Sequence, residues 1–452
     1  VPTKMFFFFS EELRRIQRVS PVTANTFDPA WLSDPSNANY VAPALRDPNA
    51  VKLLGLYPAP NVTGRTQFLT SSPGIQNTRQ EVARVDYDLN NSYRLTGRYS
   101  HDNSFTEEPG GLFLNFAVPN VSTTQTNVPG QVAAGILRST HGSNRLNEVQ
   151  FQFSSNTISD ANLAGDKNLR SSLGLTIPEV FPGNDLGVIP LLAVTGQLSN
   201  TGANQLFNIE YRNYTVTDSF TWQRGAHGLK FGGLTTFERK NENAANQTQG
   251  NFTFAAGGGH TAFYNFLSGN ADGSCGNACS YTEAQRDVTV HLRFNRYEMF
   301  AQDSWKPRAN MTVDYGVRYS LYPPVTDTNN TLTNFLPSRF DPSKAPTCAN
   351  AACTTIVAGT GDPLNGIIVA GQNSPFGDAV YAFDKTNIQP RVGVTWDPAS
   401  AGRTIYRGSY GVYYDQALVG IFEQNSFTNP PIVSTTSILN TRLSNPGAGT
   451  TA

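Results

Sequence analysis

The sequence predicts an all-β protein, a partial antiparallel transmembrane β-barrel of about 11–14 strands with long extracellular loops. Composition is the first observation behind this prediction. The 452 residues include 28 Phe, 18 Tyr and 39 Gly but only 15% charged residues, which favours strands and turns over helices. The second observation is an alternation of apolar and polar residues with a period of two. The third is that short turns alternate with long polar stretches, as in transmembrane barrels.

A lone strand at residues 5–18 and five two-strand hairpins account for most of the alternation. The hairpins occupy residues 83–100, 131–153, 214–237, 296–321 and 392–415. Their short turns lie at Asn90, Gly142, Gly225, Pro307 and Pro398. Between the hairpins run stretches rich in Asn, Thr, Ser, Gly and Pro, at residues 102–130, 157–205, 240–287 and 323–386. We expect the short turns to face the periplasm and the long loops to face the outside.

Alternation within the hairpins assigns one apolar and one polar face to each strand. It is clearest at residues 311–321, where Val313, Tyr315 and Val317 alternate with polar residues and no helix has that period. Asp218 departs from the pattern, because it lies on the apolar side. Arg and Asp residues that share a face can neutralise one another, which suits a polar lumen. The expected lumen-facing side chains are Arg84, Asp86, Arg94, Arg98, Asp314 and Arg318.

Three of the four tryptophans share a position in the hairpins. Trp222, Trp305 and Trp396 each stand at the end of an expected strand, directly before a short turn. All three would then lie at one membrane boundary, where amphipathic aromatic rings concentrate, so we expect an interfacial aromatic girdle. The alternative is that a Trp simply caps the end of a strand in any β-sandwich.

Other classes of protein are disfavoured by features that the sequence lacks. The longest apolar run, Met5 to Phe9, is far shorter than the ~20 residues of a membrane helix. A net charge of -1 offers no basic face for nucleic acid. The five His are scattered without HExxH spacing, and neither a GxSxG elbow nor a Walker loop occurs. We therefore expect no enzyme activity, no cofactor and no metal.

The four cysteines form two local pairs, Cys275 with Cys279 and Cys348 with Cys353. Three pairings are possible, and we expect the two local disulfides, which fit an oxidising compartment. A shared metal site is the alternative, although these spacings are not the usual ones for zinc and no His flanks them.

Several motifs resemble those of the Oar-like family of TonB-dependent outer-membrane receptors. They are QDSWK at residues 302–306, GVRY at 316–319, PRVGVTWDP at 390–398 and RGSYGVYYD at 407–415, and the opening KMFFFFSEELRRIQ is similar to an early strand of that barrel. The resemblance implies a plugged barrel of ~22 strands in the bacterial outer membrane. It also implies contact with outer-membrane lipid and with a periplasmic TonB-type energy-coupling protein. Residues 1–452 would then be one partial barrel domain, a fragment from which the plug and the remaining strands are absent.

Three functions follow from these observations as hypotheses. The first is a receptor and transporter whose surface loops capture an unknown ligand and whose full-length form takes it up with energy from the periplasm. The second is a surface adhesion or structural barrel without transport. The third is a secreted, soluble carbohydrate-binding β protein, for which the sequence shows neither repeated blades nor a catalytic carboxylate pair.

Overall fold

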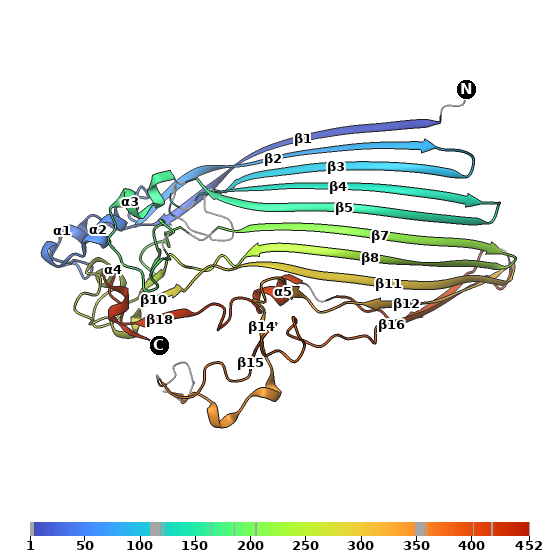
Figure 1. Ribbon diagram of the computed structural model, residues 1–452. Coiled ribbons are helices and arrows are strands. Elements are labelled where there is room, and N and C mark those ends of the chain that lie inside the picture. The colour runs from blue at the N-terminus through green and yellow to red at the C-terminus, as the bar shows by residue number, and fades with distance from the viewer. Residues whose placement is uncertain are drawn as a thin grey trace.

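A large antiparallel sheet dominates the computed structural model of the chain (Figure 1). The structure describes residues 4–108, 118, 121, 123–163, 165–184, 186–203, 206–348, 357, 359–400, 402–416 and 419–451. Twelve strands form the sheet. In pairing order they are β1 (Met5–Asn25), β2 (Gln67–Asp88), β3 (Tyr93–Glu108), β4 (Thr124–His141), β5 (Arg145–Asn162), β7 (Asn208–Arg224), β8 (His227–Asn243), β11 (Thr289–Arg308), β12 (Met311–Leu321), β16 (Ile388–Trp396) and β17 (Tyr406–Gly411), with β13 (Thr326–Asp327) beside β11. The all-β prediction is confirmed.

All five expected hairpins are present as adjacent antiparallel pairs. Their short turns lie together at one end of the sheet, here called the turn end (Figure 1). Gly142 and Gly225 in two of these turns have φ of 67° and 60°, a conformation that glycine adopts without a side-chain clash. The longer connections lie at the opposite end, here called the loop end (Figure 1).

Most strands are longer than the alternation predicted. β7 begins at Asn208 rather than near Tyr214, and β8 continues to Asn243. The lone strand expected at residues 5–18 extends to Asn25 and pairs with β2 along its whole length. The expected loops are correspondingly shorter. The physical reason is that both faces of these strands carry polar residues near the loop end, so the apolar and polar alternation disappears while the backbone stays extended.

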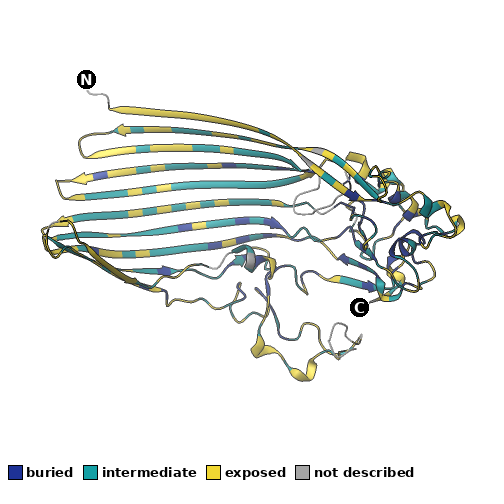
Figure 2. Ribbon diagram, turned by 180° about the vertical axis from the view of Figure 1, so that it is seen from behind, coloured by how far each residue is buried: buried dark blue, intermediate teal, exposed yellow. Residues whose placement is uncertain are grey.

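Segments from several long connections, among them the expected loops at residues 157–205 and 240–287, fold together at the loop end. A five-stranded sheet contains β6 (Leu191–Val194), β9 (Asn251–Phe254), β10 (Cys279–Ala284), β18 (Thr435–Leu439) and β19 (Thr450–Thr451). The nearby helices are α1 (Ala30–Ser33), α2 (Pro48–Leu54), α3 (Arg170–Leu173) and α4 (Ala262–Leu267). This unit is called the loop-end domain, and buried residues are concentrated there (Figure 2). Among the described residues, no helix is long and apolar enough to cross a membrane.

Aromatic side chains fill the core of the loop-end domain. Phe252, Phe254 and Phe266 are fully buried and pack on one another. Buried Glu283 joins separate connections, because its carboxylate accepts the backbone N–H groups of residues 180 and 181 at 2.8 and 3.0 Å. Tyr281 donates its hydroxyl to the same carboxylate at 2.6 Å, and burial raises the pKa of this tyrosine. Each connection supplies only a short apolar segment, so the core forms only when several connections meet.

A second core lies where later segments pack on β11. Helix α5 (Val419–Gln424) and residues 425–433 follow β17, and Phe427 and Val433 pack with Leu292 and Phe294 of β11. The pairing of β14 (Thr333–Phe335) with β15 (Ile367–Val369) contributes to the same region.

An alanine substitution distinguishes a packed loop-end domain from a set of independent loops. Leu267→Ala removes a fully buried side chain of α4 and is expected to cost about 2–5 kcal/mol of local stability. Leu45→Ala, at a position that is 60% exposed, is the matched control and should cost under about 0.5 kcal/mol. The measurement is hydrogen exchange of the amides in β9 and β10. Equal protection in the two variants would contradict a shared core.

Candidate functional site

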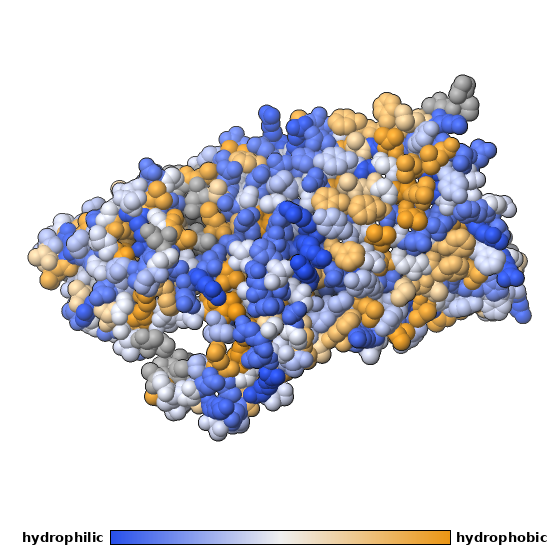
Figure 3. Space-filling model, in the orientation of Figure 1, coloured by the Kyte–Doolittle hydropathy of each residue, from blue (hydrophilic) through white to orange (hydrophobic). Residues whose placement is uncertain are grey.

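Two chemically different faces run across the large sheet. One, here called the apolar face, carries exposed apolar side chains, including Tyr315 and Val317, which are 45% and 46% exposed. The register aligns these positions from strand to strand, with Phe151 opposite Val216 and with Phe220 opposite Phe231. A hydrophobic band therefore crosses the strands in the half toward the turn end (Figure 3). The opposite side is here called the polar face.

The apolar face has a defined height along each strand. On β7 it extends from Trp222 near the turn to Tyr214, and the next positions on the same face are Arg212 and Glu210. Eight residue-to-residue steps of antiparallel strand rise about 27 Å, and a tilt of about 40° projects this to about 21 Å. That height is close to the ~25 Å apolar band of outer-membrane barrels.

The three tryptophans predicted as a girdle lie on the apolar face, near the turn end. Trp396 is the last residue of β16, as expected, whereas two further residues of β7 follow Trp222 and three of β11 follow Trp305. The strands run on because backbone pairing continues past each tryptophan. Trp305 stacks on His227 with ring centroids 6.0 Å apart, and Trp396 lies 6.1 Å from Tyr406. Their placement at a lipid boundary stays a prediction.

A second aromatic row marks the loop-ward limit of the apolar face, and sequence reasoning missed it. Tyr99 pairs with Ala133, which pairs with Phe153, and that residue faces Tyr214 with ring centroids 5.2 Å apart. The row continues through Phe237, opposite Tyr214, to Tyr297 in an edge-on contact. The signal was available in the sequence, since each ring follows the apolar alternation and lies about 9–12 residues from its turn.

The six predicted lumen-facing residues all lie on the polar face. Arg84 pairs with Asp86 at 2.7 Å, and Arg94 pairs with Asp88 at 2.6 Å. Arg318 forms an ion pair with Glu298, a residue that the prediction did not include.

The structure does not bring these six residues into one site. Arg98 lies opposite Arg84 and is in none of the ion pairs among the described residues. Asp314 and Arg318 are on β12, several strands away from β2 and β3. The polar face is therefore a broad charged wall, with local neutralisation within and between neighbouring strands.

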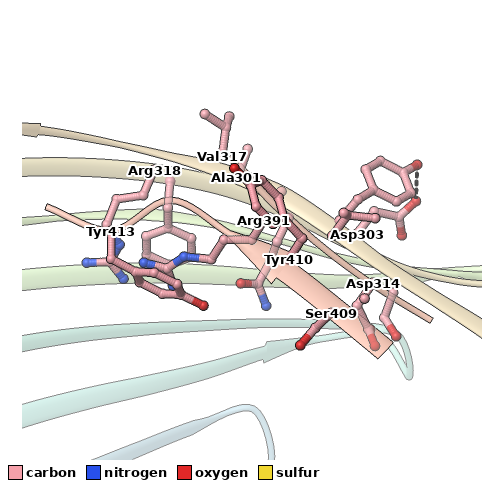
Figure 4. A pocket seen from close by; sticks show the side chains of 16 residues that line it. Ala301, Asp303, Asp314, Val317, Arg318, Arg391, Ser409, Tyr410 and Tyr413 are labelled. Atoms are coloured by element: carbon pink, nitrogen blue, oxygen red, sulfur yellow. Dashed lines mark hydrogen bonds between the residues drawn. The ribbon is translucent and has the colours of Figure 1, made fainter. Parts of the chain in front are cut away.

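A hollow of about 370 Å³ lies over β11, β12, β16 and β17, and it is the candidate binding site on the polar face. Arg391 lies over the Tyr413 ring at 4.5 Å, and Arg318 lies over Phe300 at 5.5 Å. Figure 4 shows both arginines pointing toward Tyr413, whereas Val317 points away from them. Guanidinium groups beside aromatic rings are suited to an anionic or hydrogen-bonding solute rather than to covalent chemistry.

Near the loop end, Lys240 lies between two carboxylates. It forms ion pairs with Glu242 on its own strand and with Glu423 on α5, and all three side chains are buried. The pair with Glu423 holds α5 against the polar face.

One of the two expected local disulfides lies in the loop-end domain. Cys275 and Cys279 form a disulfide with Cα atoms 5.7 Å apart. Cys348 is also disulfide-bonded, while Cys353 lies outside the described residues. In the part of the chain that the structure describes, no group of three or more His, Cys, Asp or Glu side chains is placed to hold a metal ion.

Comparisons with known proteins give one family. The family model described as outer membrane beta barrel domain matches residues 1–452. A search of curated proteins finds no match. Similar solved structures include the outer membrane transporter YddB from Escherichia coli, with 9% identity, a TM-score of 0.43 and coverage of 91% of this chain and 36% of that one.

Two further similar structures are complexes. One is P. aeruginosa FpvA in a pyoverdine–iron complex, with 11% identity, a TM-score of 0.38 and coverage of 72% of this chain and 34% of that one. The other is the FpvAI–pyocin S2 complex, with 10% identity, a TM-score of 0.40 and coverage of 76% of this chain and 38% of that one. The chain thus spans about a third of the length of the transporters that it matches.

The ion pair between Arg318 and Glu298 tests whether the polar face is wet. The Arg318 side chain is 34% exposed, so solvent should screen the pair. A double-mutant cycle with Glu298→Gln and Arg318→Gln, measured by urea unfolding, should give a coupling energy of about 1 kcal/mol or less. A single-substitution cost of about 3 kcal/mol or more would instead indicate a dry interior.

Proposed function

The chain belongs to the outer membrane beta barrel domain family, and from this membership we propose that it forms part of the wall of a TonB-dependent receptor and transporter in the bacterial outer membrane. The wall is not an enzyme and holds no cofactor. Within the described residues, β1 and β17 are the edges of the sheet. Because open sheet edges are not stable in hydrocarbon, further strands must close the barrel.

The observation that carries the membrane part of this proposal is the height-limited apolar face between two aromatic rows. A soluble β-sandwich buries its apolar face against a second sheet. Here that face is exposed over a height that matches a bilayer, and it ends at charged residues such as Arg212 and Arg239. The soluble carbohydrate-binding hypothesis conflicts with this arrangement and with the outer-membrane family.

In transport, the loop-end domain and the polar face would have different roles. The loop-end domain would capture the ligand at the cell surface, because connections positioned by a rigid scaffold commonly carry recognition. The polar face would line the aqueous route, and the hollow beside Arg391 and Tyr413 would contact a solute on its way. A periplasmic TonB-type coupling protein would supply the energy in the complete protein.

A surface-binding barrel without transport is the second candidate function. The loop-end domain favours it, because a folded unit with its own sheet and core offers a binding surface that does not depend on passage of a solute. Both candidate functions have the same barrel wall, and they differ only in whether a solute passes through the barrel.

A charge placed on each face tests the membrane orientation. Val317→Arg puts a cation on the apolar face and is expected to cost about 2–4 kcal/mol in lipid vesicles. Gln302→Arg puts the same side chain on the polar face of the neighbouring strand and should cost under about 1 kcal/mol. The measurement is reversible unfolding of the two variants in the same vesicles. The orientation is wrong if the Gln302 variant is the less stable one.

Energy-dependent uptake separates a transporter from a binding barrel. Cells with the complete protein should deplete at least one solute from the medium, as measured by mass spectrometry, and cells that lack it should not. Deleting the TonB-type coupling protein should stop this depletion while the barrel stays in the outer membrane. Surface binding that persists without any coupling-dependent depletion would favour the second candidate.

A further inference from the structure

Two arginines flank a tryptophan on the apolar face at the turn end. The guanidinium carbons of Arg145 on β5 and Arg224 on β7 lie 5.4 and 5.2 Å from the centre of the Trp222 ring. Arg145 stands directly opposite Trp222 in the sheet, and Arg224 is two residues further along the same strand. Both arginines are exposed, and the alternation places them on the side that faces lipid.

Neither arginine has a carboxylate to neutralise it among the described residues. Some arginines elsewhere in the sheet do have one: Arg84, Arg138 and Arg318 pair with Asp86, Glu148 and Glu298. The ion pairs of the described residues include neither Arg145 nor Arg224. Two positive charges therefore stand side by side at the edge of the hydrophobic band.

An apolar furrow begins one strand away from Arg224 and two strands away from Arg145. It is a shallow hollow of about 480 Å³ over β8, β11 and β12, and Arg391 of β16 also lines it. Small Ala301 lies between Phe231 and Val317 in the register, so it leaves a depression between larger neighbours. Leu229, which also lines the hollow, stands opposite Trp222. The furrow therefore starts on β8, beside Trp222, and extends across β11 to β12.

The acidic residue in the furrow is already engaged by the protein. Asp303 is only 6% exposed, and its Oδ2 lies 2.6 Å from His227 Nδ1 and accepts the hydroxyl of Tyr315 at 2.8 Å. These contacts hold the carboxylate against the surface of the sheet. The turn-side end of the furrow is thus polar, with the two uncompensated arginines next to it.

We propose that this surface binds one phospholipid of the periplasmic leaflet, with an anionic headgroup. The phosphate lies between Arg145 and Arg224, since guanidinium groups bind phosphate oxygens through charge-assisted hydrogen bonds. One acyl chain lies in the furrow over Ala301, where it contacts apolar side chains. The site is independent of transport, because it needs only the membrane orientation of the wall.

Lipid binding to the complete protein in neutral detergent micelles tests the proposal. Native mass spectrometry would follow the binding of phosphatidylglycerol, with phosphatidylcholine as the zwitterionic comparison. Arg145→Gln and Arg224→Gln should each weaken phosphatidylglycerol binding about fivefold, and the double variant roughly tenfold or more. Ala301→Leu fills the furrow without changing charge, so it should weaken binding of both lipids.

Arg65→Gln is the matched control, because Arg65 is an exposed arginine in a connection at the loop end. It should bind phosphatidylglycerol as the unmodified chain does. Equal binding of the two lipids by the unmodified chain would overturn the proposal, as would normal phosphatidylglycerol binding by the double arginine variant. Displacement of the lipid by inorganic phosphate alone would show an ordinary anion site and would also overturn it.

Discussion

Backbone hydrogen bonding in hydrocarbon is the constraint on which the rest of this structure depends. A strand that crosses a bilayer finds no water for its N–H and C=O groups, so each strand must pair with a neighbour on both sides. The continuous ladder from β1 to β17 meets this requirement at every interior strand. Once the strands are paired, successive side chains point to opposite faces of the sheet, so each residue faces either the lipid or the lumen. The apolar face and the polar face both follow from this alternation.

The same ladder extends beyond the lipid and carries the parts that recognise other molecules. Outward positions on β7 change from Tyr214 to Arg212 within one repeat, yet the strand continues to Asn208. Paired strands therefore project above the second aromatic row and position the loop-end domain. A rigid base lets short apolar segments from distant connections meet in one core, which none of them would form alone.

How much the sequence revealed depended on how local the determining interactions are. Residues 311–321 were assigned correctly to two faces, because alternation is a property of neighbouring residues. Asp218 was recognised as an exception, and the structure shows Asn147 donating to it at 3.0 Å on the apolar face. The loop-end domain was missed because its core joins residues far apart in sequence. The contact between His227 and Asp303, 76 residues apart, was invisible for the same reason.

The central claim is that alternate residues of these strands meet lipid up to a fixed height and water beyond it. Nitroxide labels placed singly along β7, from residue 208 to residue 222, measure this directly in lipid vesicles through their access to oxygen and to a water-soluble nickel complex. The account predicts oxygen access at even positions from 214 to 222, nickel access at the odd positions between them, and a change to nickel access at 212 and 210. Nickel access at every even position, or the same access for odd and even positions, would contradict it.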